Sequence, residues 1–562
     1  MTPYYRGALY RSFDLFPLPA GDPAYVDCVD VRGDRDVVQE LADVIDFAEP
    51  GKFTCQLYTG ARGCGKSTEL LRLEKRLTDS GYTVVYLEAD RGDIEIEDTE
   101  HTDILLACAR SILSQLEDVA DPKPLLLWLQ QRLERIKDLV LLEVGIDSGA
   151  DAIPTFMNLM SKFKAVPEVR HEVRHQVELQ MPSLLEILNH FLDEAHNNLA
   201  ARNSTEHNRG IVVIVDNLDR IVPVWDKAGR SNHEKIFLDR HNLMRGLKCH
   251  VIYTVPISMV YSSYSSNLVE NYGQTIVMPM VMVKQCNGRP YLPGIDCLQN
   301  MLIKRLKRDQ IPMTLAELFA EPKQLDLLCE KSGGYLRNFM QLMQAVVKHS
   351  AKLPIQEMAV TRASSEMREI YRRSIYGEEW KLLAEVSISK SISKDNAVGA
   401  YRDLLFRRCV LEYYQTNPDG ALEAWYSVHP LIEEMEQFQA AKAELEDSAN
   451  GADPSRENSS QKNGSPELHT NIKQTHINLK SISVFDQESP LIRVMNEAEQ
   501  EYIQFIEEKR YGEAAEIAKK IHDMWEEQVE SMKHNPKSDD YIAAVAWSSY
   551  WHLRYNIYNA RS

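Results

Sequence analysis

The sequence lacks several features that would assign it to a specialised class of protein. Its nine cysteines are scattered and form no Cys-x-x-Cys pair, which excludes a disulfide framework or a zinc knuckle and favours a reducing cytoplasm. No run reaches the ~18 apolar residues of a membrane span, and the first residues contain no apolar core of the signal type. These absences predict a cytoplasmic protein without a membrane partner.

Positive charge is also in short supply. The chain has 64 Lys and Arg residues against 83 Asp and Glu residues, for a formal net charge of −19. This balance disfavours a protein that coats nucleic acid, although it allows a local basic patch. With 44% hydrophobic and 26% charged residues, the composition is that of a folded globular protein. A chain of 562 residues predicts about three or four domains.

Short apolar runs predict a parallel sheet in the first half of the chain. Strands are expected at residues 52–58, 82–90, 211–216, 250–255 and, as a further candidate, 274–283. Helical patterns follow the first strand and occupy residues 102–117 and much of 123–208. Strands that alternate with helices predict an α/β fold, and unbroken Val/Ile runs are typical of strands buried on both faces.

The segment "GARGCGKS", Gly60 to Ser67, fits the phosphate-loop pattern G-x-x-x-x-G-K-[ST] between a predicted strand and a predicted helix. Its glycines allow backbone N–H groups to face phosphates at the positive end of a helix. We expect Lys66 to neutralise the β- and γ-phosphates of ATP and Ser67 to offer a hydroxyl to Mg²⁺. The predicted loop contacts are Gly60, Gly63, Cys64, Gly65, Lys66, Ser67 and Thr68.

The run "IVVIVDNLDR", residues 211–220, ends a buried strand in an acid. A magnesium ion on phosphates favours a carboxylate at such a strand end, which makes Asp216 the predicted metal-side acid. Asp219 either polarises a water molecule, pairs with Arg220 or caps a helix. Asn217, directly after Asp216, can orient water but cannot take its proton, so slow hydrolysis is expected, and Asn217→Glu is predicted to speed it.

Beyond residue 290 the chain becomes helical, and residues 379–434 read as helix, helix and hairpin, the outline of a winged helix. Together with the phosphate loop, the segments "IVVIVDNLDR", "CHVIYTVP", "SGGYLRNFM" and "AWYSVHPLIEEM" resemble, in this order, STAND signalling ATPases and the related Orc/Cdc6-like branch of AAA+ proteins. The resemblance covers roughly residues 25–437.

The resemblance implies further site residues. Thr254 corresponds to a sensor that orients the attacking water, and Arg337 to a lid arginine that reaches the γ-phosphate. A threonine at a strand end and a solvated helix arginine are the plainer interpretations. Val31 and Arg32 correspond to residues beside the adenine. Arg220 is a weaker candidate for an arginine finger.

The resulting segments are an N-terminal extension, an ATPase core, a helical lid, a winged helix, a flexible linker and a helical C-terminal adaptor. Their expected ranges are 1–24, 25–285, 286–360, 361–440, 441–475 and 476–562. Through Arg402, Arg407 and Arg408 the winged helix either reads DNA or, as the acidic chain favours, packs as a lever.

Three functions remain open at this point. The resemblance implies an ATP switch that couples nucleotide state to self-association or to a protein effector, with a bacterial defence or stress role. One alternative is an Orc/Cdc6-like ATPase that acts on duplex DNA. Another is a scaffold that holds ATP as a structural ligand.

Overall fold

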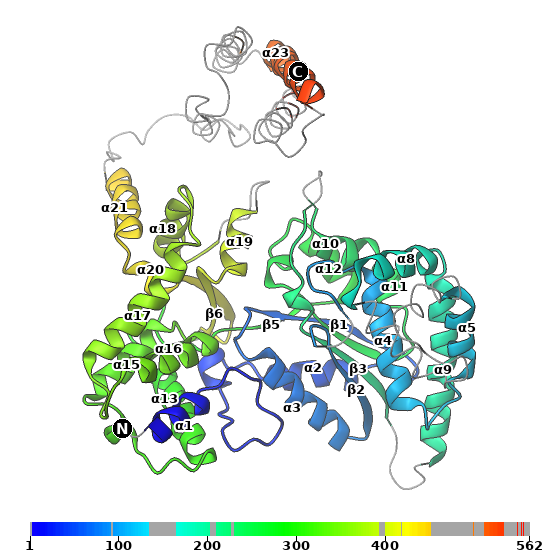
Figure 1. Cartoon of the computed structure of the whole chain (residues 1–562), viewed down its shortest axis with the longest axis horizontal. Helices are drawn as coiled ribbons and strands as arrows, with labels where there is room; N and C mark the ends of the chain where they lie inside the picture. Colours follow the sequence, from blue (N-terminus) through cyan, green and yellow to red (C-terminus); the bar gives the residue numbers. More distant parts are fainter. Residues whose placement is uncertain are drawn as a thin grey trace. The chain divides into compact units, whose positions relative to one another are not determined.

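The computed structural model describes residues 3–91, 94–133, 164–202, 209–225, 230–392, 399–417, 419–450 and 511–532, with isolated residues elsewhere (Figure 1). The chain divides into two compact units, Met1–Asp453 and Pro454–Ser562. In the second unit, helix α23 (Tyr511–Met532) lies within the predicted C-terminal helical pattern. Apart from this helix and isolated residues, the predicted C-terminal adaptor at 476–562 lies outside the described residues. No helix in the described part of the chain is long and apolar enough to cross a membrane.

The first unit is built around a five-stranded sheet in the order β2-β3-β4-β1-β5, and all pairs are parallel. Its strands are β1 (Cys55–Gly60), β2 (Tyr82–Glu88), β3 (Gly210–Asp216), β4 (His250–Thr254) and β5 (Ile276–Met278). The predicted parallel α/β fold is therefore confirmed. The last strand is shorter than the predicted 274–283 because the backbone N–H of Met280 donates to Glu412 and that of Met282 donates to Val31, outside the sheet.

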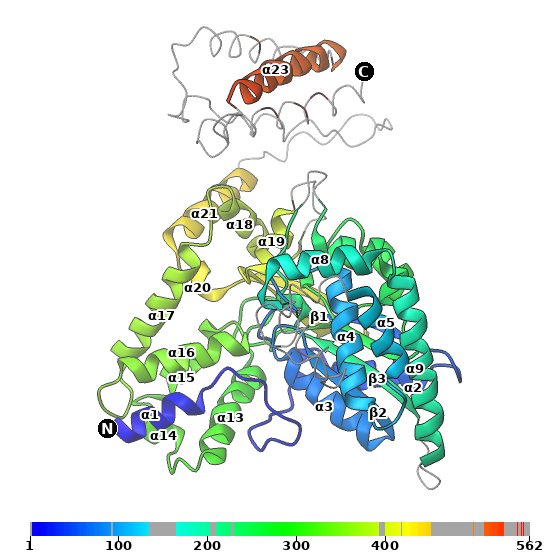
Figure 2. The same cartoon turned by 45° about the vertical axis from the view of Figure 1, so that its right-hand side comes forward.

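Helices cover both faces of this sheet (Figures 1 and 2). Along β3 the side chains alternate: Val213 packs with α4 and α9, whereas Val212 packs with α2 and α3, as the two-residue period of a strand requires. Because both sets are buried, β3 reads as an unbroken apolar run. The flanking helices are α2 (Val37–Asp46), α3 (Lys66–Asp79), α4 (His101–Leu116), α5 (Lys123–Leu133), α8 (Pro167–Glu178), α9 (Met181–Arg202), α10 (Asn232–Glu234), α11 (His241–Met244) and α12 (Ser265–Tyr272).

A group of helices follows the sheet over the range predicted as the lid, and it is called the lid below. These helices share one hydrophobic core with the N-terminal helix. The N-terminal helix is α1 (Pro3–Ser12), and the lid helices are α13 (Leu292–Arg308), α14 (Leu315–Leu318), α15 (Pro322–Lys331), α16 (Leu336–His349) and α17 (Glu357–Arg372). Leu9 and Phe13 are fully buried against Leu302 and Phe339, so the predicted N-terminal extension is part of the lid's packing. Helix α17 also crosses the expected boundary at residue 360, because no glycine or proline interrupts it.

The remaining part of the first unit contains the predicted hairpin. Its elements are α18 (Glu379–Ser389), α19 (Ala400–Phe406), β6 (Val410–Thr416), β7 (Leu422–Val428), α20 (Pro430–Glu433) and α21 (Glu436–Asn450). Strands β6 and β7 pair antiparallel across the turn that starts at Asn417, which confirms the hairpin prediction. Helix α21 extends through the first ten residues of the predicted linker, since "AKAELEDSAN" contains good helix formers and no Gly or Pro. Residues 451–475 of that linker lie outside the described residues.

Candidate nucleotide site

The phosphate loop lies between β1 and α3, as the motif predicts. Gly63 and Gly65 have φ angles of 89° and 113°, a left-handed region that favours glycine. A Cβ atom on Gly63 would lie 2.6 Å from the Cβ of Arg337 in the lid. The glycines therefore allow both the curl of the loop and the close approach of the lid.

Lys66 begins α3 and points into the loop that precedes it. Its Nζ donates to the carbonyl oxygen of Gly60 at 2.7 Å and lies 2.9 Å from Oδ2 of Asp219. Burial is the largest effect and opposes the charged form, but Asp219, Cys64 and Asp216 together outweigh it, and the net effect is a raised pKa of Lys66. The lysine is thus held as a cation at the position where the motif expects phosphate oxygens.

Asp216 ends β3 beside the first turn of α3 and is fully buried. Its Oδ2 accepts from the Tyr86 hydroxyl at 2.9 Å, and the Ser67 hydroxyl also hydrogen-bonds to its side chain. Burial raises the pKa of Asp216 in spite of these hydrogen bonds. Asp216 and Ser67 together offer a carboxylate and a hydroxyl oxygen, which are ligands that Mg²⁺ accepts.

The turn after Asp216 is held from two sides. Asn217 has a left-handed backbone, with φ of 68°, and its Nδ2 donates to Oδ1 of Asp90 at 2.7 Å. Leu218 N donates to the Thr254 hydroxyl at 2.9 Å, and that hydroxyl lies 3.3 Å from the Val215 carbonyl oxygen. Thr254 thus fixes the turn that carries Asn217 and Asp219, and it is not among the residues that line the adjoining cavity.

A cavity opens over the phosphate loop, and its lining contains several basic side chains. Arg62, Lys66, Arg220 and Arg337 line it together with Asp219. The backbone N–H of Arg337 donates to the Gly63 carbonyl oxygen at 3.2 Å, which ties the lid helix α16 directly to the loop. Burial lowers the pKa of Arg62, and the neighbouring arginines 408, 220 and 337 lower it further. Such a group of cations is suited to a polyphosphate.

The N-terminal segment and the lid add apolar side chains to the lining of the cavity, together with the charged Asp14 and Arg305. Its apolar lining includes Leu15, Phe16, Pro17, Leu18, Val26, Met301, Leu336 and Met340. The backbone N–H of Leu18 donates to the Thr68 hydroxyl at 3.1 Å, so the N-terminal segment is attached to the first turn of α3. These apolar lining residues fit the flat base of a nucleotide whose phosphates contact the basic lining residues.

The predicted site residues are only partly brought together. Gly63, Gly65, Lys66, Ser67, Thr68, Asp219, Arg337 and Arg32 line the cavity, whereas Gly60, Cys64, Asp216, Thr254 and Val31 do not. Arg32 is buried, and its Nη2 donates to the Cys64 carbonyl oxygen at 2.7 Å. Val31 is buried in the hydrophobic core that contains the lid helices.

Sequence reasoning missed Asp90 and the apolar N-terminal wall. The one available signal for Asp90 is that it is the last residue of the strand predicted at 82–90, because the carboxyl ends of parallel strands meet at one edge of a sheet. No comparable signal exists for Leu15 to Leu18, whose place depends on the packing of α1 against the lid.

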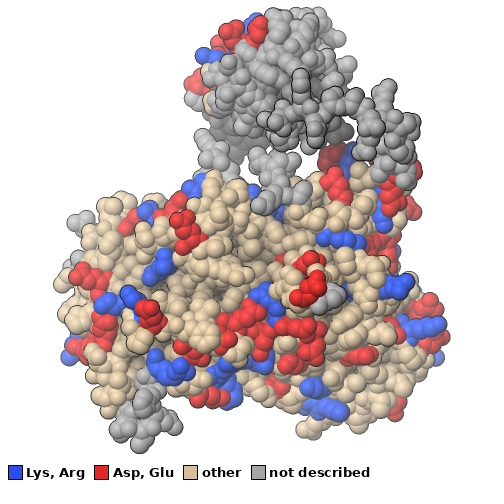
Figure 3. Space-filling model, turned by 180° about the vertical axis from the view of Figure 1, so that it is seen from behind, with Lys and Arg blue, Asp and Glu red and all other residues tan. Residues whose placement is uncertain are grey.

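Two of the three arginines considered for DNA contact, Arg402 and Arg407, make contacts inside the first unit. Arg402 lies 3.6 Å from Glu234 and stacks over Trp225, and Arg407 pairs with Glu379 and Asp403. Among the described residues on the face in Figure 3, basic side chains lie between acidic ones and form no continuous stripe. The helix α19 that carries Arg402 is therefore fastened to the core.

Comparison with known proteins finds similarity to solved structures alone. No protein-family model and no curated protein matches the chain. The ORC2 protein of Aeropyrum pernix, solved in ADPNP–ADP complexes, is 13% identical over 78% of this chain and 98% of its own, with a TM-score of 0.36. The Walker-type ATPase PABY2304 of Pyrococcus abyssi is 12% identical over 75% and 98%, with a TM-score of 0.34. Cdc6p of Pyrobaculum aerophilum is 13% identical over 77% and 98%, with a TM-score of 0.30.

Two of these neighbours carry Orc or Cdc6 names, and the third is named a Walker-type ATPase. At such identities and TM-scores they carry no argument about what this chain binds or does. The assignment of function therefore depends on the site itself.

Proposed function

We propose that this protein is an ATP-dependent switch that binds ATP with Mg²⁺ and hydrolyses it slowly. The observation that carries this proposal is the main-chain hydrogen bond from Arg337 to Gly63, which joins the lid to a phosphate loop lined with cations. In this proposal Lys66 and Arg337 bind the phosphates, and Ser67 and Asp216 hold the metal ion. The apolar residues that line the cavity contact the base. The metal ion would supply charge neutralisation on the phosphates.

Slow turnover follows from the acids present at the site. Asn217 occupies the position after Asp216 and has no proton-accepting carboxylate. Asp219 lines the cavity but is ion-paired with Lys66 at 2.9 Å. A carboxylate engaged in this way is a poor general base until its partner turns to phosphate.

The lid also contacts the hairpin, which supports coupling beyond the site. The Tyr413 hydroxyl in β6 donates to the Gly333 carbonyl oxygen at 2.7 Å, three residues before the start of α16. If Arg337 moves when phosphates bind, the movement would be transmitted to the hairpin through Gly333 and Tyr413. In the proposed function, this movement controls self-association or an effector contact through the second unit, as in STAND proteins.

The first experiment compares Lys66→Ala with the matched control Lys75→Ala. Lys75 lies on the same helix but is exposed and pairs with Asp79. We expect Lys66→Ala to lose binding of a fluorescent ATP analogue and any ATP-driven change in mass measured by size exclusion with light scattering, whereas Lys75→Ala retains both. Equal nucleotide binding in the two variants would refute the nucleotide site.

The alternatives are tested in the same preparation. The DNA-associated function is weaker because Arg402 and Arg407 are engaged in ion pairs. It predicts duplex binding at low salt that weakens when Arg407 and Arg408 are neutralised. A structural ATP ligand predicts nucleotide that survives purification and does not exchange with labelled ATP.

A further inference from the structure

Asp90 lies at the edge of the candidate site, two residues after the end of β2. Strands β2 and β3 pair so that Glu88 lies opposite Asp216, and Ala89 N donates to the Asp216 carbonyl oxygen at 2.9 Å. This register places Asp90 beside the turn that follows β3. One carboxylate oxygen accepts from Asn217 Nδ2 at 2.7 Å, and the other is ion-paired with Arg220.

This contact determines which end of the Asn217 amide is left for the cavity. An ionised carboxylate can only accept hydrogen bonds, so the amide NH₂ group faces Asp90. The amide oxygen is then the free end of a residue that lines the cavity, whereas Asp90 is not among the lining residues. Arg220 also lines the cavity. The Asp90 carboxylate therefore holds two side chains that line the cavity, Asn217 and Arg220.

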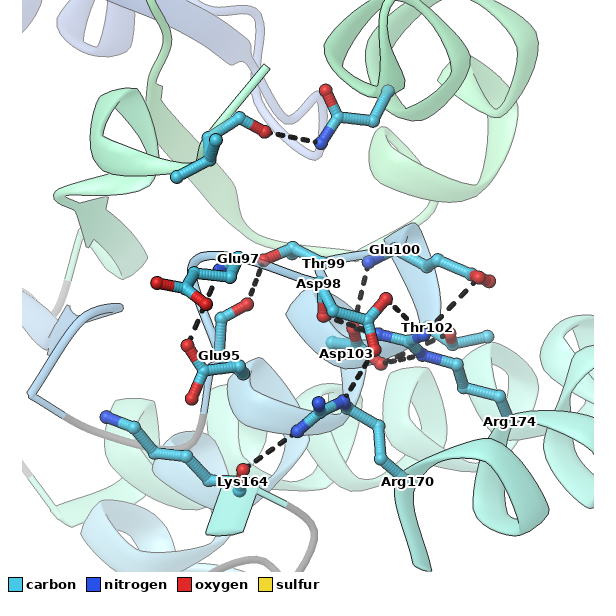
Figure 4. Close-up of polar contacts among 12 residues, drawn as sticks. Glu95, Glu97, Asp98, Thr99, Glu100, Thr102, Asp103, Lys164, Arg170 and Arg174 are labelled. Atoms are coloured by element: carbon cyan, nitrogen blue, oxygen red, sulfur yellow. Dashed lines mark hydrogen bonds and ion pairs between the residues drawn. The ribbon is translucent and has the colours of Figure 1, made fainter. Parts of the chain in front are cut away.

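The loop that starts at Asp90 is fastened at both ends. Lys164 Nζ donates to the Asp90 carbonyl oxygen at 2.7 Å. At the far end, Asp98 accepts from Arg170 Nε and Arg174 Nη1, both at 2.9 Å (Figure 4). These arginines come from α8 of the helical segment between β2 and β3. Apart from its side-chain contacts, Asp90 is thus also held through its main chain by Lys164.

We propose that Asp90 is the positioning residue of the hydrolytic step. It directs the Asn217 amide oxygen and the Arg220 guanidinium toward the γ-phosphate region. In this pair the Asn217 amide lines the cavity, whereas the Asp90 carboxylate does not. This inference rests on the proposed ATPase function. It adds to that function a residue that orients Asn217 and Arg220.

The arrangement predicts that the two side chains can be exchanged. In Asp90→Asn, the Asn217 amide and Arg220 lose their carboxylate partner. In Asn217→Asp, two carboxylates face each other within hydrogen-bond distance, which is unfavourable unless they share a proton. In the double variant Asp90→Asn/Asn217→Asp, the hydrogen bond is restored with reversed polarity, and a carboxylate faces the cavity.

The test measures ATP affinity and the single-turnover hydrolysis rate for the wild type, both single variants and the double variant of the full chain. We expect each single variant to hydrolyse ATP ~10-fold more slowly, equal to about 1.4 kcal/mol in the barrier, with a Kd that changes less than ~3-fold. The double variant is expected to match or exceed the wild-type rate. Asp79→Asn, an exposed acid on α3, serves as the control and is expected to change nothing.

Failure of the inference can be told apart from failure of the proposed function. If the wild type binds no ATP, the proposed function is wrong. If the wild type binds and hydrolyses ATP but Asp90→Asn retains the wild-type rate, the positioning inference alone is wrong. A double variant that recovers the thermal stability lost by the single variants and remains as slow as they are also contradicts it, because Asp90 would then have a structural role.

Discussion

Removing the charge of Lys66 should destabilise the protein as well as abolish nucleotide binding. The Nζ of Lys66 lies 2.9 Å from Asp219, and the two side chains are only 5% and 6% exposed. In Lys66→Met the side chain keeps its approximate length but leaves Asp219 as a buried carboxylate without its nearest cation. A loss of ATP binding in this variant would therefore have two causes.

The size of the effect follows from the burial of the pair. Breaking a buried ion pair from one side typically costs ~3–5 kcal/mol. We expect the lower value, about 3 kcal/mol, because Arg62 also faces Asp219 and compensates part of its charge. For a folded unit that spans Met1–Asp453, the loss corresponds to a fall in Tm of about 3 °C.

The double variant Lys66→Met/Asp219→Asn separates the two causes. It removes both charges, so its Tm should return to within about 1 °C of the wild type, while ATP binding stays lost. Differential scanning fluorimetry gives the Tm values, and titration with a fluorescent ATP analogue gives binding. If the double variant is as unstable as the single one, the ion pair is not what Lys66 contributes. If it binds ATP, Lys66 is not a phosphate ligand.

Two further predictions concern the contacts of the lid and the hairpin. Gly63→Ala places a Cβ 2.6 Å from the Cβ of Arg337 at a φ of 89°, so we expect at least ~10-fold weaker ATP binding, measured by analogue titration. No weakening would mean that the lid does not need this approach. Burial raises the pKa of Glu412 from 4.5 to about 6, so its stabilising effect is complete below pH 4.5 and is lost as the pH rises through 6, a change of about 2 kcal/mol. Glu412→Gln should therefore raise Tm at pH 7.5 but not at pH 4.5, and an equal shift at both values would refute the assignment.

Much of the core could be predicted because its signals are local. The strand β3 is an apolar run because both faces of the sheet are covered. The turn that starts at Asn417 is a local signal that predicts the hairpin. The phosphate loop is a short pattern whose backbone conformation depends on its own glycines. In these elements the residues that determine the structure are neighbours in the chain.

The prediction for Asn217→Glu shows where local reasoning ends. From the sequence alone, a carboxylate after Asp216 should speed hydrolysis. The structure places Asp90 at 2.7 Å from the Asn217 amide, so a new carboxylate there would face an existing one, and we no longer expect a gain from the single change. The contact joins residues 127 positions apart, a separation that no motif spans.

The sequence by itself determined the parallel core, the phosphate loop and the acid at the end of β3, since periodicity and glycine placement act over a few residues. Only the tertiary structure decided that Leu15 to Leu18 wall the cavity, that Arg337 bonds to Gly63, and that Arg402 and Arg407 are engaged in ion pairs inside the unit. These contacts depend on how the N-terminal segment, the lid and the hairpin pack on the core. Such packing is a sum of many weak burial terms, and no single stretch of residues encodes it.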